Sequence, residues 1–183
     1  MRKTIPALLT GVLASAAFAY AAGAPTVASI YNGQIRGIES DIVPLAEAMP
    51  ADKYNFAPTQ GEFTGVRTFA QQAKHVAAVV YAMSAAALNE KPPVNIESED
   101  GPASMQSKEQ IVQFLKGAFA YAHKAANSLT AENQLDQVKA IGEGTMARGQ
   151  AVGMVAWHSF DHYGQMVVYA RMNGIVPPAS RRR

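Results

Sequence analysis

The chain has 183 residues, contains no cysteine, and carries 16 Lys and Arg against 14 Asp and Glu. The lack of cysteine excludes disulfides and thiolate metal ligands, so a metal ion would have to be held by His, Asp or Glu. The near balance of charge argues against a nucleic-acid-binding surface, because the three arginines at 181–183 form a short tail and not a basic patch.

The first residues of the chain have the features of a secretory signal peptide. The segment starts with two basic residues, continues with an apolar run and ends in small residues that suit a signal peptidase. We therefore expect a signal peptide over 1–22, one exported domain over 23–183, and a periplasmic or extracellular location. An uncleaved membrane anchor is the alternative, because the apolar run is barely as long as the roughly 20 residues that span a bilayer. After cleavage we expect no stable membrane insertion.

The first predicted helix runs from Val27 to Met49, where apolar residues recur at spacings of three and four. Pro44 lies near its end and is expected to bend or loosen the last turn. The following segment, 50–67, contains two prolines and two glycines and is predicted to be an ordered loop.

A capping box, in which Thr68 is followed three residues later by Gln71, predicts the start of a second helix that continues through Leu88. The next stretch, 89–106, is polar, acidic and rich in proline. We expect it to connect two helices along the surface.

A second capping box, Ser107 with Gln110, predicts a third helix that ends before Thr130. The stretch 131–144 is interpreted as holding a short helix, and no segment has a convincing strand pattern.

The last predicted helix covers about 145–173 and ends at Gly174, with two prolines shortly after it. Four helices of this length in a chain of this size predict an all-α fold, an antiparallel four-helix bundle.

Two histidines in the last helix, His158 and His162, are four residues apart. Residues at this spacing lie on the same face of a helix, about 6 Å apart, so both rings can approach one ion. His75, in the middle of the second helix, is the candidate for a third ligand. Three neutral imidazoles suit Zn, Ni, Fe or Cu and leave a coordination position for water or substrate. The alternative is that these are hydrogen-bonded core histidines without a metal.

Other residues near these histidines have less specific patterns. His123, on the flank of the third helix, is interpreted as a surface or rim residue. Trp157, Met166 and Tyr169 recur at helical spacing in the last helix and are interpreted as core.

Two segments have motifs that are similar to those of a known family. The sequence HSFDHYGQMVVYARMNGIVPP, residues 158–178, contains a His, three residues and His-x-Gly-Gln in a helix that ends near Val-Pro, and it resembles the carboxy-terminal signature of the DinB-like superfamily. The sequence DKYNFAPTQGEFTGVRTFAQQAKHV, residues 52–76, is similar to the loop after the family's first helix and the start of its second. The resemblance implies a DinB-like four-helix bundle with a divalent metal held by His75, His158 and His162.

The resemblance also draws attention to residues around the metal site. Many relatives have a histidine directly before the second ligand of the last helix, where this chain has Asp161. Asp161 is expected either to face water or to accept a hydrogen bond that orients a ring. Gln165 is a candidate to donate to a ligand or to metal-bound water, with a satisfied interior amide as the alternative. Tyr54, on the loop before the second helix, is a candidate to line the substrate side of the site or to plug the end of the bundle.

The resemblance implies a divalent-metal-dependent enzyme, a transferase or hydrolase, that acts on a small molecule through the open coordination position. Characterised relatives transfer low-molecular-weight thiols to electrophiles, but those thiols are intracellular, which conflicts with the expected export. The alternative is a non-catalytic secreted bundle that binds a metal or another ligand. Helices rich in alanine and glycine also make a homodimer possible. The metal, expected to be Zn, Ni or Fe, is not specified by the sequence.

Overall fold

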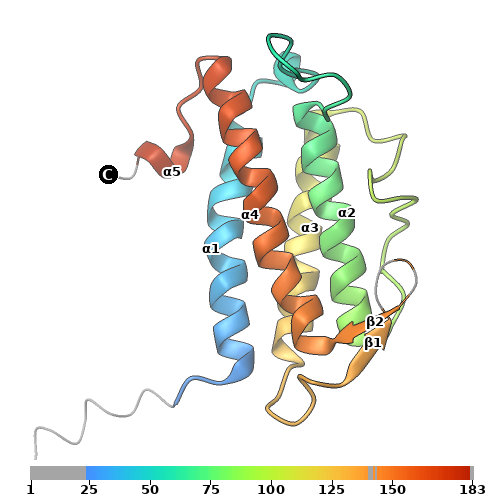
Figure 1. Ribbon diagram of the computed structural model, residues 1–183. Coiled ribbons are helices and arrows are strands. Elements are labelled where there is room, and N and C mark those ends of the chain that lie inside the picture. Colours follow the sequence, from blue (N-terminus) through green and yellow to red (C-terminus); the bar gives the residue numbers. More distant parts are fainter. Residues whose placement is uncertain (1–23, 140–141, 143, 182–183) are drawn as a thin grey trace, which may run out of the picture.

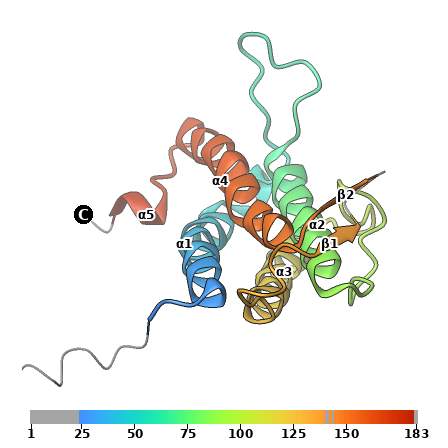
Figure 2. The same ribbon diagram turned by 60° about the horizontal axis from the view of Figure 1, so that its bottom comes forward.

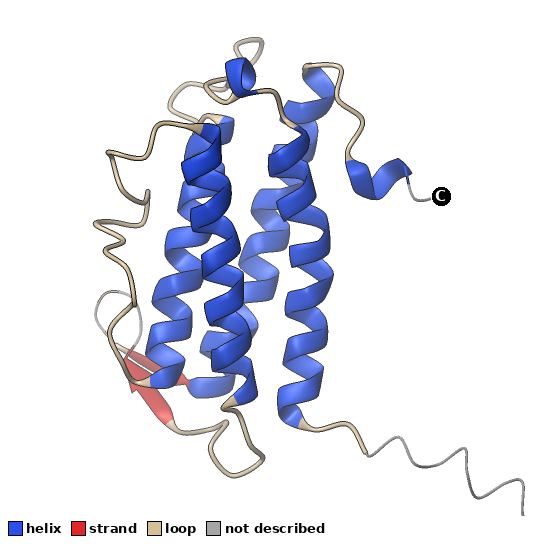
Figure 3. Cartoon of the chain, turned by 180° about the vertical axis from the view of Figure 1, so that it is seen from behind, coloured by secondary structure: helices blue, strands red, loops and turns tan. Residues whose placement is uncertain are grey.

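The computed structural model describes residues 24–139, 142 and 144–181; the predicted signal peptide, 1–22, lies outside these residues. Four long helices form a bundle (Figure 1), which confirms the predicted all-α fold. Two short strands pair at one end of the bundle (Figure 3). The elements are α1 (Val27–Ala48), the 3-10 helix η2 (Ala51–Lys53), α2 (Phe69–Leu88), α3 (Lys108–Asn127), β1 (Gln137–Lys139), β2 (Thr145–Ala147), α4 (Arg148–Met172) and α5 (Pro178–Arg181).

The four helices surround a single core, and each packs mainly against two neighbours. α1 lies between α3 and α4, and α2 also lies between α3 and α4. The connection 89–107 crosses from one end of the bundle to the other, so α2 and α3 run in the same direction, and so do α1 and α4 (Figure 1). The antiparallel packing predicted for the whole bundle is therefore found between α1 and α3 and between α2 and α4.

Capping boxes begin three of the four long helices. The predicted boxes at Thr68 and Ser107 are both present, and a third, which has Ser29 in place of the usual Glu or Gln, begins α1 at Thr26. In each box a side-chain hydroxyl accepts from a backbone amide that the helix leaves unpaired. Pro44 lies inside α1, and the helix continues beyond it to Ala48.

α2 is buried on most of its surface, because α3 and α4 pack against two of its sides (Figure 2). Alanines line much of this helix and let its neighbours approach closely. Four polar side chains are buried with them: Gln72, Lys74 and His75 in the first half of the helix, and Ser84 near its end. Burial of a polar group is costly unless it forms hydrogen bonds, and Gln72, Lys74 and His75 have internal partners.

The region 131–144, predicted to hold a short helix, instead leads into a β-hairpin. β1 pairs antiparallel with β2, and Val138 buries its side chain while its neighbours are exposed. Gly142 and Gly144 adopt positive φ angles of 81° and 130°, which glycine tolerates without steric cost. Strands of three residues are too short to produce a visible alternation, which explains why the sequence pattern missed them. As a result α4 begins at Arg148 and not at 145.

The carboxy-terminal end of the chain leaves α4 and returns toward α1. Gly174, with φ of 74°, follows the last turn of α4, and α5 then packs against α1. Among the described helices, none combines the length and the apolar composition needed to cross a bilayer.

Candidate metal centre

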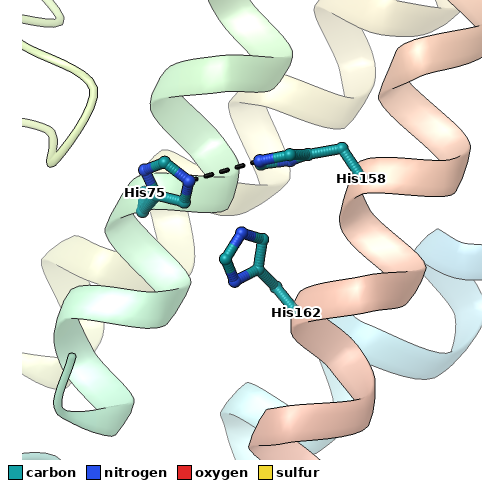
Figure 4. A group of neighbouring side chains, drawn as sticks. All are labelled: His75, His158 and His162. Atoms are coloured by element: carbon teal, nitrogen blue, oxygen red, sulfur yellow. Dashed lines mark hydrogen bonds between the residues drawn. The ribbon is translucent and has the colours of Figure 1, made fainter. Parts of the chain in front are cut away.

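Three histidine side chains meet between α2 and α4. His75 comes from α2, and His158 and His162 come from successive turns of α4 (Figure 4). Each offers one ring nitrogen, and these three atoms lie within 4.8 Å of one another. The structure thus brings together the three residues that the sequence singled out, and they could hold a metal ion.

The antiparallel packing of α2 and α4 produces this arrangement. His75 lies beside both histidines of α4, with its ring centroid 5.1 Å from that of His158 and 4.7 Å from that of His162. The rings of His158 and His162 are 4.6 Å apart, as expected for side chains one turn apart on the same helical face.

The protonated nitrogen of His75 is fixed by the loop that follows α2. Its Nδ1 lies 2.6 Å from the backbone carbonyl oxygen of Glu99. A carbonyl oxygen can only accept, so Nδ1 carries the proton. The Nε2 lone pair of His75 therefore points toward the other two histidines.

A chain of amide side chains fixes the proton of His162 in the same way. The chain ends at the carboxylate of Asp161, which can only accept, and Gln165 donates to it from Nε2 over 3.3 Å. The oxygen of Gln165 then accepts from Gln72 Nε2 at 2.8 Å, and the oxygen of Gln72 lies 2.5 Å from His162 Nδ1. His162 Nδ1 is thus a donor, which leaves its Nε2 with a lone pair.

His158 is the least satisfied of the three rings. Its Nε2 lies 3.2 Å from the Nε2 of His75, and its Nδ1 is buried without a hydrogen-bond partner among the described residues. Two nitrogens at this distance must share a proton or a cation. A tetrahedral zinc ion with bonds of about 2.0–2.1 Å separates its nitrogen ligands by about 3.3 Å, so the observed distance fits a shared ion.

Burial keeps these histidines neutral at physiological pH. The pKa of His158 and of His162 is lowered to about 4, mainly by desolvation; His162 and His75 also contribute to the lowering for His158, and His75 contributes for His162. Desolvation also lowers the pKa of His75. Because only neutral imidazole binds a metal, the site is ready to accept a cation without first losing protons.

A polar cleft of 690 Å³ opens beside His162. Its volume is within the range of small-molecule sites, and His162 is the member of the cluster that lines it. Its walls are formed by Gly65, Val66, Arg67, Gln71, Gln72, Asp100, His162 and Gln165.

Arg67 connects the cleft to the loop that orients His75. Its guanidinium lies 2.8 Å from a carboxylate oxygen of Asp100 and 3.3 Å from one of Glu99. The same loop turns at Glu97 and Gly101, whose φ angles are 54° and 72°. The ion pairs thus hold the loop in the position from which the Glu99 carbonyl reaches His75.

Sequence reasoning missed the partners of the histidines, Gln72 and Glu99. Gln72 could have been found, because it is a polar residue three positions before His75 and therefore lies on the same side of the helix. Glu99 contributes a backbone carbonyl, for which side-chain patterns carry no signal. Of the predicted neighbours, Gln165 and Asp161 are exposed at the rim and complete the hydrogen-bond chain to His162.

Tyr54 lies in the core. Only 3% of its surface is exposed, its hydroxyl donates to the carbonyl oxygen of Ala46 at 2.6 Å, and its ring packs edge-on against Phe69. These contacts hold the loop after α1 against the end of the bundle, which agrees with the alternative that Tyr54 plugs this end. They direct the Tyr54 hydroxyl toward α1.

The interpretation of Trp157 as a core residue is wrong, because 59% of its surface is exposed. Met166 and Tyr169 are buried as expected. Trp157 is nine residues from Met166, which on a helix corresponds to about half a rotation, so the two side chains lie on opposite faces.

His123 is partly buried between α3 and α1. Its two ring nitrogens lie 2.7 Å from Asn32 Oδ1 and 3.0 Å from a carboxylate oxygen of Glu39. This position agrees with the expected rim location and separates His123 from the three clustered histidines, which lie between α2 and α4.

Comparisons with known proteins agree with this fold. A family model described as the DinB superfamily matches residues 34–166, which include all three clustered histidines. The crystal structure of a DinB-like protein from Bacillus cereus ATCC 10987 superposes with a TM-score of 0.62 at 15% identity, covering 81% of this chain and 93% of the other. A DinB-like protein from Bacillus subtilis gives a TM-score of 0.60 at 14% identity, covering 79% and 92%. No curated protein matches the chain. The extent of the family match shows that this chain belongs to the DinB superfamily.

Proposed function

We propose that this protein binds one divalent transition metal ion, Zn, Ni or Fe, through the Nε2 atoms of His75, His158 and His162, and that it is a metal-dependent transferase or hydrolase acting on a small molecule. One observation carries the proposal. The Nδ1 atoms of two rings are committed as donors, so two Nε2 lone pairs point inward and a third ring nitrogen joins them.

A metal-free cluster would be poorly satisfied. A proton shared between His75 and His158 joins those two rings but leaves the Nε2 lone pair of His162 without a donor among the described residues. The Nδ1 atom of His158 has no partner with or without a metal, so it favours neither state. A cation that takes the Nε2 lone pairs explains why three neutral imidazoles, two of them buried and that of His158 partly buried, face one another.

Within this site the protein's own residues have distinct tasks. The Glu99 carbonyl and the Gln72 amide keep the protons of His75 and His162 on Nδ1 and so aim Nε2 at the ion. Three neutral ligands leave the ion's double charge uncompensated, which would let it polarise a carbonyl group or lower the pKa of bound water or thiol. The cleft beside His162 admits the substrate.

We further propose that the protein is exported, that 1–22 are removed, and that it works in the periplasm or outside the cell. The basic start, apolar run and small residues of that segment support export. The small size and polar walls of the cleft favour a small-molecule ligand. The near balance of positive and negative charge argues against a nucleic-acid partner.

A non-catalytic role as a metal- or ligand-binding protein is the second candidate, and one observation favours it. Asp100 is the only carboxylate among the described residues that line the cleft, and it is paired with Arg67. The cleft wall therefore presents no unpaired carboxylate as a general base, so catalysis would depend on the metal.

Metal analysis of protein purified without a histidine tag tests the site. We expect about one ion per chain, its loss in His75→Ala, and its retention in His123→Ala, which removes a histidine outside the cluster. Equal metal content in the wild type and His75→Ala would reject the three-histidine site. Assays of the loaded protein with esters, amides, and thiols paired with electrophiles then separate a catalyst from a binder, and inactivity on all of them favours the binder.

A further inference from the structure

The outward face of α4 carries an apolar stripe, which we define as Trp157, Phe160, Gly164, Val168 and Met172. The four large side chains are 59%, 45%, 52% and 52% exposed. Successive members of the stripe, with Gly164 included, are three or four residues apart. This spacing places them along one side of the helix. α4 lies at the front of the bundle in Figure 1, with its neighbours behind and beside it. The exposure of the stripe residues shows that their side of α4 faces away from the core.

A stripe of this kind is unusual on a solvent-facing helix, whose outer face is normally charged. The inner face of α4 is already occupied by buried residues such as Val155 and Met166. α4 is therefore apolar on two opposite sides, and a helix that is apolar all round is typically buried. The second apolar side indicates a partner.

The stripe is self-complementary. If a second copy of α4 lies antiparallel across it, with the twofold axis at Gly164, then Phe160 of each copy is level with Val168 of the other. Trp157 is likewise level with Arg171 and next to Met172. Bulky aromatic residues at one end thus meet smaller or flexible residues from the other end, as a symmetric interface between identical chains requires.

Gly164 occupies the crossing point, and no contact in the described part of the chain requires a glycine there. A Cβ atom added to it would have no neighbour within 4 Å, and its helical position makes no use of glycine's conformational freedom. Glycine weakens the middle of a helix. A residue without a side chain is useful at this position if a second backbone approaches it closely.

Charge is complementary in the same pairing. Asp161 and Arg171 are the charged residues of the outward face, and both are exposed. The antiparallel arrangement brings Arg171 of one copy to the level of Trp157 of the other, where a guanidinium can stack on the indole, and within one turn of Asp161. The twofold axis repeats both contacts.

The stripe supplies part of the area that an interface needs. From the exposed fractions, the four large side chains offer on the order of 350 Å² of apolar surface, nearly half of the roughly 800 Å² that each partner buries in a standard interface. The backbone around Gly164 and the flanking polar residues would contribute the remainder. We infer that the apolar stripe is the interface of a symmetric homodimer, in which two copies of α4 pack antiparallel and cross at Gly164.

Cysteine crosslinking tests the pairing in the full chain, which has no cysteine of its own. Gly164→Cys should form a disulfide-linked dimer on mild oxidation at micromolar concentration, at least tenfold more than Gly33→Cys. Gly33 is the matched control, because it is an exposed helical glycine of α1 that also has no atom within 4 Å of an added Cβ. Comparable crosslinking of the two variants would overturn the inference.

The register is tested by mixing two variants. Trp157→Cys and Met172→Cys should crosslink to each other when mixed but hardly to themselves, because self-pairing would have to join positions about 20 Å apart along the helix axis. Crosslinking within each variant that equals crosslinking in the mixture would overturn the antiparallel register.

Light scattering over a range of concentrations tests association itself. We expect a dimer whose dissociation constant rises at least tenfold in Gly164→Glu and is unchanged in Gly33→Glu, with circular dichroism confirming that both variants are folded. A monomer at every concentration overturns the inference. A dimer that Gly164→Glu leaves intact also overturns the inference, because association then uses another surface, such as the apolar run within 1–22. In that case the stripe has another partner, such as lipid.

Discussion

Gln72 is the single side chain on which the orientation of His162 most depends. It accepts the Nδ1 proton of His162 and passes the hydrogen-bond chain on to Gln165. Partners of this kind, outside the ligands themselves, typically change metal affinity 10- to 100-fold when they are removed. We expect Gln72→Leu to weaken zinc binding by about that factor in a competition titration.

Gln72→Glu is the matched control, because its carboxylate still accepts the proton from His162. It should retain most of the affinity. If Gln72→Leu binds zinc as tightly as the wild type, the amide is not what aims His162.

The buried histidines also make the metal-free protein sensitive to acid. The pKa of His158 and of His162 is about 4 in the folded state, below the ordinary value of 6.5. As the pH falls below 6.5, the unfolded chain takes up protons on these residues while the folded chain does not, so the free energy of unfolding decreases. The loss is complete only when the pH has fallen through the folded-state value.

Urea titrations of metal-free protein between pH 7 and pH 5 measure this loss, in a range where few carboxylates titrate. We expect the decrease in the free energy of unfolding to be smaller in His158→Gln, which removes one of the two histidines with a lowered pKa. A free energy of unfolding that stays constant over this range in the wild type would contradict the burial of neutral rings.

Some features of individual residues could not be predicted from the sequence. The spacing of His158 and His162 and the polar ring of His75 suggested the cluster, and the resemblance to the DinB-like superfamily was needed to favour it over hydrogen-bonded core histidines. Their hydrogen-bond partners were not predictable, because Gln72 meets His162 only through the packing of α2 against α4. Trp157 was placed in the core because helical spacing alone does not identify which of two opposite faces is buried.

The loop between α2 and α3 acts as part of the metal site. Arg67, at the start of α2, holds Asp100 and Glu99, and the Glu99 carbonyl holds His75. Partly exposed ion pairs of this kind add little stability by themselves. Their effect should therefore appear in the orientation of His75 and less in the stability of the fold.

We expect Arg67→Ala to lower zinc affinity severalfold and to reduce the share of His75 protonated on Nδ1 in the metal-free protein, as read from ¹⁵N NMR of the imidazole. Lys116→Ala, which breaks the exposed ion pair with Glu47 elsewhere on the bundle, is the control and should change neither quantity. An unchanged His75 tautomer in Arg67→Ala would mean that the loop holds its shape without the ion pairs.

The elements themselves were largely predictable, since periodicity located four helices and the capping boxes at Thr68 and Ser107 fixed two of their starts. The β-hairpin was missed because three-residue strands have no measurable period. Its effect on the site is indirect: it leads the chain into α4, whose first residue, Arg148, donates to the carbonyl of Ala87 and fixes the start of α4 to the end of α2.

For the whole molecule, a bundle was predictable but the direction of its helices was not. A connection as long as 89–107 can either turn back at the same end or cross to the other, and its polar composition fits both paths. The structure shows that it crosses, which leaves α2 and α4 antiparallel neighbours across the histidine cluster (Figure 1). The position of the metal site thus follows from the chain path as much as from the histidines.

A metal ion bound at this position would join α2 to α4, and it should stabilise the whole bundle because the unfolded chain lacks the assembled site. At a free concentration 100 times the dissociation constant, binding stabilises a protein by about 2.7 kcal/mol. For a domain of this size that corresponds to a rise in melting temperature of roughly 5–10 °C. We expect zinc to produce this rise in the wild type and in His123→Ala, and to produce little or none in His75→Ala, in which the ligand from α2 is missing and the two helices are no longer joined. An equal rise in His75→Ala would show that zinc stabilises the bundle from another position, since only ligands on both helices can join them.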